Sequence, residues 1–80
     1  MTGYIESMPD GGTRNYGFIK GENEDQYFFH RDNFNGHWND LVRDFNVREG
    51  PIIVSFDTVS SEKGLRAANV RRLDYPNEAA

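Results

Sequence analysis

Aromatic side chains interleaved with basic ones are the residues of this sequence whose types and spacing could do chemistry. They stand in two short segments, and the set is Arg14, Tyr16, Phe18, Lys20, Phe28, His30 and Arg31. A ring can stack on the face of a nucleobase, and a cation beside it neutralises a phosphate. The planar guanidinium of arginine can also stack on rings and bases. These residues therefore favour a surface for single-stranded nucleic acid.

The elements that must position these side chains are short strands separated by turns. We expect five strands, at residues 2–8, 15–20, 26–31, 52 to 58 or 59, and 65–73, although residues 66–68 could also be helical. Aromatic and β-branched residues favour these strands, and clusters of Gly, Pro, Asn and Asp end them. A short chain buries little apolar surface, and closing its sheet removes the exposed edges. The sequence thus predicts one all-β domain over residues 1–73, a five-stranded barrel of the oligonucleotide-binding type, and a flexible tail at 74–80.

Strand alternation divides the aromatic residues between two faces. Tyr27 and Phe29 share one face of their strand with the expected core, whose members are Ile5, Ile19, Tyr27, Phe29, Ile52, Val54, Phe56 and Val70. The opposite face carries Tyr16, Phe18, Phe28 and His30, which a small barrel cannot also bury. The alternative is that the loop covers these rings, and alternation alone does not decide between the two. Their basic neighbours favour an exposed binding surface.

The polar segment between the third and fourth expected strands, residues 32–49, is predicted to be a long, partly ordered loop. Leu41, Val42 and Phe45 have the spacing of about one helical turn, and we do not expect a helix of ten or more residues. Trp38 could extend the surface on which bases stack, at one end of the expected binding site. Equally, it could pin the loop to the barrel, which we favour slightly.

The charge balance argues weakly against a nucleic-acid partner, because 13 acidic residues outnumber 9 basic ones and the net charge is −4. Most of the acidic residues, however, stand in the 22–25 turn, the 32–49 segment and the tail. A locally basic face is therefore compatible with the acidic total. The total predicts modest affinity and strong salt dependence rather than an absence of binding.

Several other classes of protein are not expected. The chain has no cysteine and no apolar run long enough to span a membrane, and its first residues do not resemble a signal peptide. His30 with Asp32 could form an acid–base pair, and His37 and Asp40 could join them at a metal, but a surface ion pair is the simpler interpretation. We expect a cytoplasmic monomer without catalytic residues, metal, cofactor or small-molecule substrate.

Several motifs together resemble those of the cold-shock domain family, which includes bacterial cold-shock proteins and Y-box proteins. Residues 14–19, Arg-Asn-Tyr-Gly-Phe-Ile, resemble the first ribonucleoprotein motif, and residues 27–30, Tyr-Phe-Phe-His, resemble the second. Their order in the chain is that of the cold-shock domain and not that of an RNA-recognition motif. Residues 2–5 resemble the opening strand of the family, Gly50 with residues 54–56 its fourth strand, and residues 63–70 its closing run. The resemblance therefore extends over residues 2–73.

The resemblance implies a five-stranded antiparallel barrel that binds single-stranded RNA or DNA with little sequence preference, as an RNA chaperone or a regulator of transcription or translation. Carried over by position, Tyr16, Phe18, Phe28 and His30 would stack on bases, and Arg14 would contact phosphate. The chain departs from the family at residues 6–9, Glu-Ser-Met-Pro, where the family has Lys-Trp-Phe-Asn. The loss of a cation and two rings predicts weaker binding.

Two alternatives place the barrel among protein-interaction modules. The first is a domain like SH3, in which exposed rings hold a proline-rich peptide. It does not explain the basic residues beside the rings. The second is a degenerate cold-shock fold that has lost nucleic-acid binding through the changes at residues 6–8.

Overall fold

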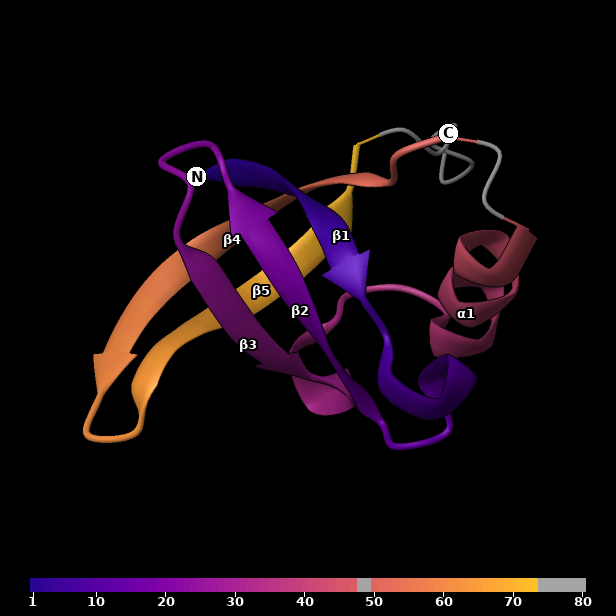
Figure 1. Ribbon diagram of the computed structural model, residues 1–80, viewed down its shortest axis with the longest axis horizontal. Helices are drawn as coiled ribbons and strands as arrows, with labels where there is room; N and C mark the ends of the chain where they lie inside the picture. The colour runs from indigo at the N-terminus through magenta and orange to yellow at the C-terminus, as the bar shows by residue number, and fades with distance from the viewer. Residues whose placement is uncertain (48–49, 74–80) are drawn as a thin grey trace.

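The computed structural model describes residues 1–47 and 50–73, which fold into a β-barrel with one α-helix at its end (Figure 1). In chain order the elements are β1 (Thr2–Ser7), η1 (Pro9–Gly12), β2 (Tyr16–Gly21), β3 (Gln26–His30), η2 (Arg31–Asn33), α1 (Trp38–Val47), β4 (Ile53–Ser61) and β5 (Gly64–Arg72). All five expected strands are present, and β5 is a strand along its whole length. The tail expected at 74–80 lies outside the described residues.

The five strands close in the order β1-β2-β3-β5-β4. Every neighbouring pair is antiparallel except β3 and β5, which run parallel and pair at Phe28 and Arg66. The expectation of a wholly antiparallel sheet is therefore wrong. The reason is geometric, because strand directions cannot alternate all the way round a closed ring with an odd number of members.

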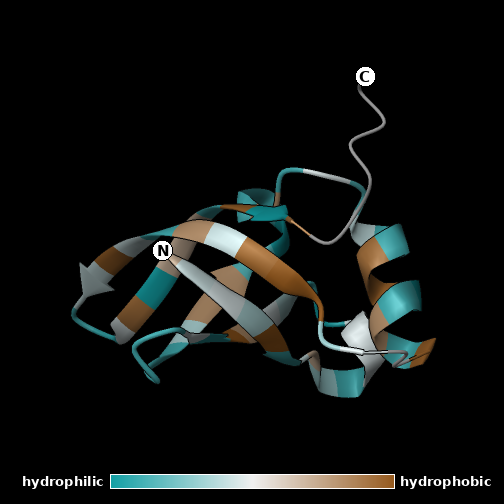
Figure 2. Cartoon of the chain, turned by 90° about the horizontal axis from the view of Figure 1, so that it is seen from above, coloured by the Kyte–Doolittle hydropathy of each residue, from teal (hydrophilic) through white to brown (hydrophobic). Residues whose placement is uncertain are grey.

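The helix α1 corrects the expectation of a loop with about one helical turn. It has ten residues, of which Trp38 and Leu41 are buried, while Val42 and Phe45 pack against the core. These four positions follow the i, i+3, i+4, i+7 spacing of an amphipathic helix. Figure 2 shows hydrophobic residues alternating with hydrophilic ones along the helix. The residues between these four positions are mostly polar, which is why the composition of the segment is typical of a loop.

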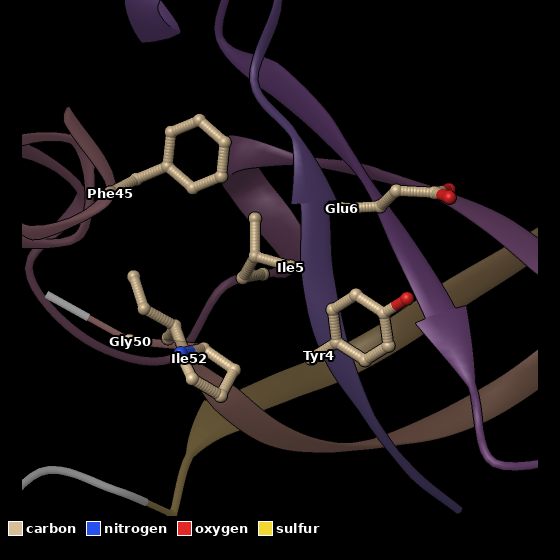
Figure 3. Close-up of a pocket in the computed structure, with 7 residues that line it drawn as sticks. Tyr4, Ile5, Glu6, Phe45, Gly50 and Ile52 are labelled. Atoms are coloured by element: carbon tan, nitrogen blue, oxygen red, sulfur yellow. The ribbon is translucent and has the colours of Figure 1, made fainter. Parts of the chain in front are cut away.

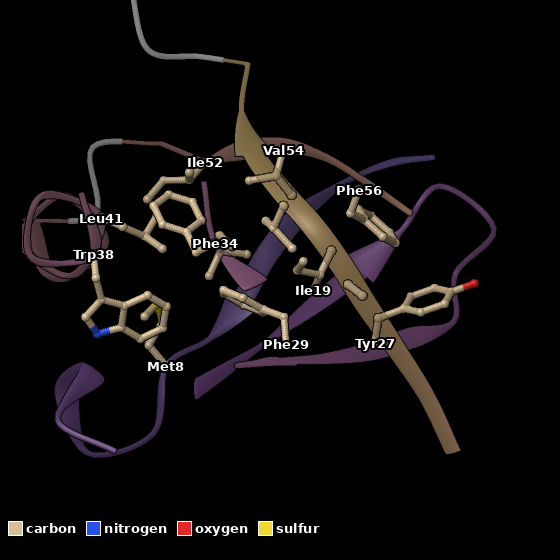
Figure 4. Packing of buried hydrophobic residues seen from close by; sticks show 13 residues of the cluster. Met8, Ile19, Tyr27, Phe29, Phe34, Trp38, Leu41, Ile52, Val54 and Phe56 are labelled. Atoms are coloured by element: carbon tan, nitrogen blue, oxygen red, sulfur yellow. The ribbon is translucent and has the colours of Figure 1, made fainter. Parts of the chain in front are cut away.

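The core runs through the barrel from one end to the other. Figure 4 shows Tyr27 and Phe56 at one end and Trp38 and Leu41 at the end where α1 packs. All eight expected core residues are buried, and the structure adds Met8, Phe34, Trp38, Leu41 and Ala67. The helix therefore acts as a plug for an interior that the five strands alone would leave open.

The contact between Phe29 and Gly17 fixes the register of β2 and β3. Phe29 is fully buried, and its register partner is Gly17. A Cβ atom at Gly17 would lie only 3.0 Å from the ring of Phe29 and from the carbonyl oxygen of Ser7. The same register makes Phe18 the partner of Phe28 and Tyr16 the partner of His30.

Polar contacts fasten α1 to the barrel and to η1. The guanidinium of Arg72 donates to the Asp44 carboxylate at 2.8 Å, and Arg43 donates to the other oxygen of Asp44 at 3.1 Å. The indole N–H of Trp38 donates to the carbonyl of Gly12 at 3.3 Å. The Arg72 and Arg43 guanidinium groups, that of Arg72 first, hold the pKa of Asp44 below its ordinary value of 3.8.

Replacing Phe29 by alanine tests the register. We expect Phe29→Ala to lower the free energy of unfolding by about 3–5 kcal/mol, because it leaves a cavity in the core. The neighbouring substitution Phe28→Ala should cost much less, since Phe28 lies on the outer face. Urea unfolding of both variants measures the difference. Equal losses would show that both faces of β3 are core.

Replacing Asp44 by asparagine tests the attachment of the helix. A lowered folded-state pKa means that the carboxylate contributes stability above its unfolded-state pKa, and that this stability is lost as the pH falls through the folded-state pKa. We expect Asp44→Asn to cost about 0.5–1 kcal/mol at about pH 7 and almost nothing at about pH 2. Asp40→Asn is the control, because the one ion pair of Asp40 within residues 1–47 and 50–73 is a longer contact with Arg43, at 3.5 Å. A loss that persists unchanged at about pH 2 would contradict an electrostatic origin.

Candidate functional site

Four side chains form a cluster on the outer face of β2 and β3, namely Tyr16, Phe18, Phe28 and His30, called the aromatic cluster below. Each of them is half-buried, and none belongs to the hydrophobic core. The predicted division of the rings between two faces is thus confirmed. The alternative, in which the segment after β3 covers the rings as core, does not hold, because α1 packs at the end of the barrel instead.

The three carbocyclic rings of the aromatic cluster touch one another. The ring centroids lie 5.2 Å apart for Tyr16 and Phe28, 5.8 Å for Tyr16 and Phe18, and 5.9 Å for Phe18 and Phe28. Tyr16 and Phe28 are tilted by 31°, whereas Phe18 stands at 86° to Tyr16 and 71° to Phe28. Edge-to-face contact of this kind stabilises the cluster and offers flat surfaces in two orientations.

The imidazole of His30 is oriented by the turn that follows β3. Its Nδ1 accepts the backbone N–H of Asp32 at 3.0 Å, which caps η2. The neutral ring must then carry its proton on Nε2. The carboxylate of Asp32 lies 3.6 Å from the same Nδ1, but a proton there would break the amide contact. His30 therefore offers an N–H donor from Nε2 at the edge of the cluster.

Two cations lie on the same outer face as the rings. Lys20 follows Phe18 by two positions in β2, and Arg66 of β5 places its guanidinium carbon 4.9 Å from the centre of the Phe28 ring. Both are half-buried, and neither forms an ion pair with any residue in the described part of the chain. Sequence reasoning missed Arg66, because only the β3–β5 pairing brings it to the cluster. The only signal was that a closed barrel must pair its last strand with an earlier one.

The other two predicted cations lie at the edge of the cluster and have partners. The Nε of Arg14 donates to Asp10 at 2.6 Å, and this hydrogen bond, aided by the charge of Asp10, raises the pKa of Arg14. The guanidinium of Arg31 reaches the side-chain oxygen of Asn15 at 3.4 Å. Both arginines are exposed, so a phosphate could exchange with these partners.

Strand β1 adds no ring to the aromatic cluster. Ser7 is the register partner of Phe18, Met8 turns into the core, and Glu6 accepts a hydrogen bond from Gln26 at 2.9 Å. A carboxylate and a hydroxyl thus border the rings on this side. The weaker binding expected from residues 6–8 stays a prediction.

Trp38 is not part of the exposed surface. Its side chain is 5% exposed and meets Phe29 and Phe34 edge to face, with centroids 5.8 Å and 6.1 Å away. Two roles are expected for Trp38. The structure agrees with the second, in which the indole attaches its segment to the barrel. The expected role in stacking on bases is wrong, because Trp38 is needed to close the core.

A separate hollow of about 260 Å³ lies between β1, α1 and the segment before β4 (Figure 3). Its walls are mainly apolar; the lining residues are Tyr4, Ile5, Glu6, Phe45, Gly50, Pro51 and Ile52. None of the aromatic cluster lines it. The hollow also lacks the basic groups found beside the rings, so its lining does not match a nucleic-acid strand.

The sequence matches no protein-family model and no curated protein. Over residues 1–47 and 50–73, no helix has the length and apolar character needed to cross a membrane. The same residues contain no group of three or more His, Asp or Glu side chains placed to hold a metal ion.

Proposed function

We propose that this chain is an oligonucleotide-binding barrel of the cold-shock type, which binds single-stranded RNA or DNA through its aromatic cluster. The observation that carries the proposal is the set of three touching, half-buried rings on β2 and β3, bordered by Lys20 and Arg66. Rings beside cations match the two chemical components of a nucleic-acid strand.

The arrangement of the strands supports this type of barrel. Barrels of the oligonucleotide-binding type have five strands and bind their ligands on the face of strands 2 and 3, with help from the β1–β2 and β4–β5 loops. Here the aromatic cluster lies on β2 and β3. Arg14 follows η1 in the β1–β2 connection, and Lys63 stands in the β4–β5 turn.

The binding mechanism combines stacking with charge. Bases stack on Tyr16 and Phe18, beside Phe28, which lies between Tyr16 and the guanidinium of Arg66. Lys20 meets the phosphates, and His30 donates from Nε2. Because any base has a flat face, stacking alone gives little sequence preference. A protein of this kind can hold RNA unpaired, which suits an RNA chaperone or a regulator of transcription or translation.

The acidic groups around the cluster limit the affinity. The carboxylate of Asp10 offsets part of the positive charge of Arg14, and the carboxylate of Glu6 repels the strand on the β1 side. We therefore expect modest affinity. Binding should weaken with salt because the cations beside the rings displace counterions from the phosphates.

A titration with short oligonucleotides tests the proposal. We expect six-residue oligothymidine or oligouridine to shift the NMR signals of Tyr16, Phe18, Phe28 and His30, because bases stack on the cluster. His37, exposed beside α1, is the internal control and should not respond. Affinity should fall linearly with salt on logarithmic axes. If these four residues show no shift at millimolar ligand and low salt, the proposal fails and a protein-interaction module remains.

Replacing a ring of the cluster tests the stacking. We expect Phe18→Ala to weaken binding by about 1–3 kcal/mol, the contribution of one stacked base, while the fold is retained. Ile53→Ala is the matched control, since Ile53 is also a partly exposed apolar residue on a strand but lies on β4, outside the cluster. Fluorescence anisotropy of a labelled oligonucleotide measures both variants. Equal affinities for the two would contradict a stacking role for Phe18.

A further inference from the structure

We propose that Arg66 recognises guanine in the bound strand, through hydrogen bonds from its guanidinium to N7 and O6 of the base. This inference rests on the proposed function and adds a base preference to it. It starts from the position of Arg66, which is the one arginine seen to lie over a ring of the aromatic cluster among the described residues.

The side chain of Arg66 has an apolar register partner on each neighbouring strand. On one side is Phe28, its parallel register partner, whose ring centre lies 4.9 Å from the guanidinium carbon. On the other side is Val59, its register partner in β4. Side chains paired across strands in this way lie in contact distance. The guanidinium is therefore oriented before any ligand arrives, which lowers the entropy cost of using it.

No hydrogen bond among the described residues uses the donors of Arg66. Arg14, Arg31, Arg43 and Arg72 each donate to a carboxylate or an amide oxygen. Within residues 1–47 and 50–73, Arg66 donates to no side chain or backbone group. A guanidinium has five N–H donors in a planar fork, and this one is only half-buried. Its donors can therefore meet a ligand.

The position of the Arg66 guanidinium over the Phe28 ring favours a contact with a base rather than with a phosphate. It lies over the face of Phe28, and bases stacked on the adjacent rings Tyr16 and Phe18 occupy the same layer above the sheet. A donor within that layer meets the edges of bases, whereas phosphates follow the outside of the strand. Guanine presents two acceptors, N7 and O6, on one edge and fits the fork with two hydrogen bonds. Adenine, cytosine and thymine do not offer two acceptors on that edge.

The test compares six-residue oligothymidine with six hexamers that each carry one guanine at a different position. We expect the best-placed guanine to tighten binding at least about fivefold, the smallest effect typical of a two-bond contact. Replacing that guanine by 7-deazaguanine should remove most of the gain, because N7 is lost. Hypoxanthine should retain it, because N7 and O6 remain.

The variant Arg66→Lys keeps the positive charge of Arg66 but removes its planar set of N–H donors. We expect this variant to bind oligothymidine within about threefold of the wild type, but to lose most of its preference for guanine. Arg71→Lys is the matched control, since Arg71 is also a β5 arginine without a partner among the described residues, and it lies beside Met1 and Ser55 instead of the cluster. It should keep the full preference.

The possible results separate the inference from the function on which it rests. Binding of oligothymidine without a preference for guanine overturns the role of Arg66 alone. The role of Arg66 is also overturned if the Arg66→Lys variant keeps the preference for guanine, or if this variant loses the same affinity for every hexamer. If Arg66→Lys does not fold, an unchanged affinity of the wild type for the 7-deazaguanine hexamer likewise overturns that role. Failure of every hexamer to bind the wild type removes the proposed function and the inference together.

Discussion

The burial of Phe29 against Gly17 is the contact on which the outer surface of this barrel depends. Phe29 is fully buried, and a Cβ atom at Gly17 would press on its ring at 3.0 Å. This pairing sets the register of β2 and β3, and a slip by one residue would exchange the two faces of a strand. With Phe29 inside, Phe28 and His30 must face outward. The aromatic cluster is therefore a consequence of how the core packs.

Closure of the sheet brings a further cation to the outer face of β2 and β3. Five strands in a ring require a parallel pair, and here it joins β3 to β5. That pair places Arg66 over Phe28, although the two residues are far apart in the sequence. The net charge of −4 gives no hint of this local cation. Carboxylates that neutralise arginines, such as Asp10 and Asp44, lie toward the η1 and α1 end of the barrel.

Local patterns predict the strands and the two faces of the barrel, because side-chain alternation depends only on neighbouring residues. They predict about one turn in place of α1, because Leu41, Val42 and Phe45 alone cover about one turn of a mostly polar segment. Only with Trp38 on the same face does the spacing become that of a longer amphipathic helix. Arg66 escapes sequence reasoning for a different reason. Its contact depends on the register between β3 and β5, which no local pattern contains. The stacking role expected of Trp38 is wrong because a small barrel needs a large side chain to fill its open end.

The parallel pairing of β3 and β5 has a consequence for the dynamics of the barrel. Near the cluster these strands pair at Phe28 and Arg66, and farther along the chain Phe34 bridges to Val70. A closed sheet opens most easily where two strands share few paired residues. Amide hydrogens of β3 and β5 therefore exchange with solvent through local opening. A strand of nucleic acid lying across Phe28 and Arg66 would hold β3 and β5 together. Part of the binding free energy would then stabilise the closed barrel, and the amide hydrogens of β3 and β5 would exchange more slowly with solvent.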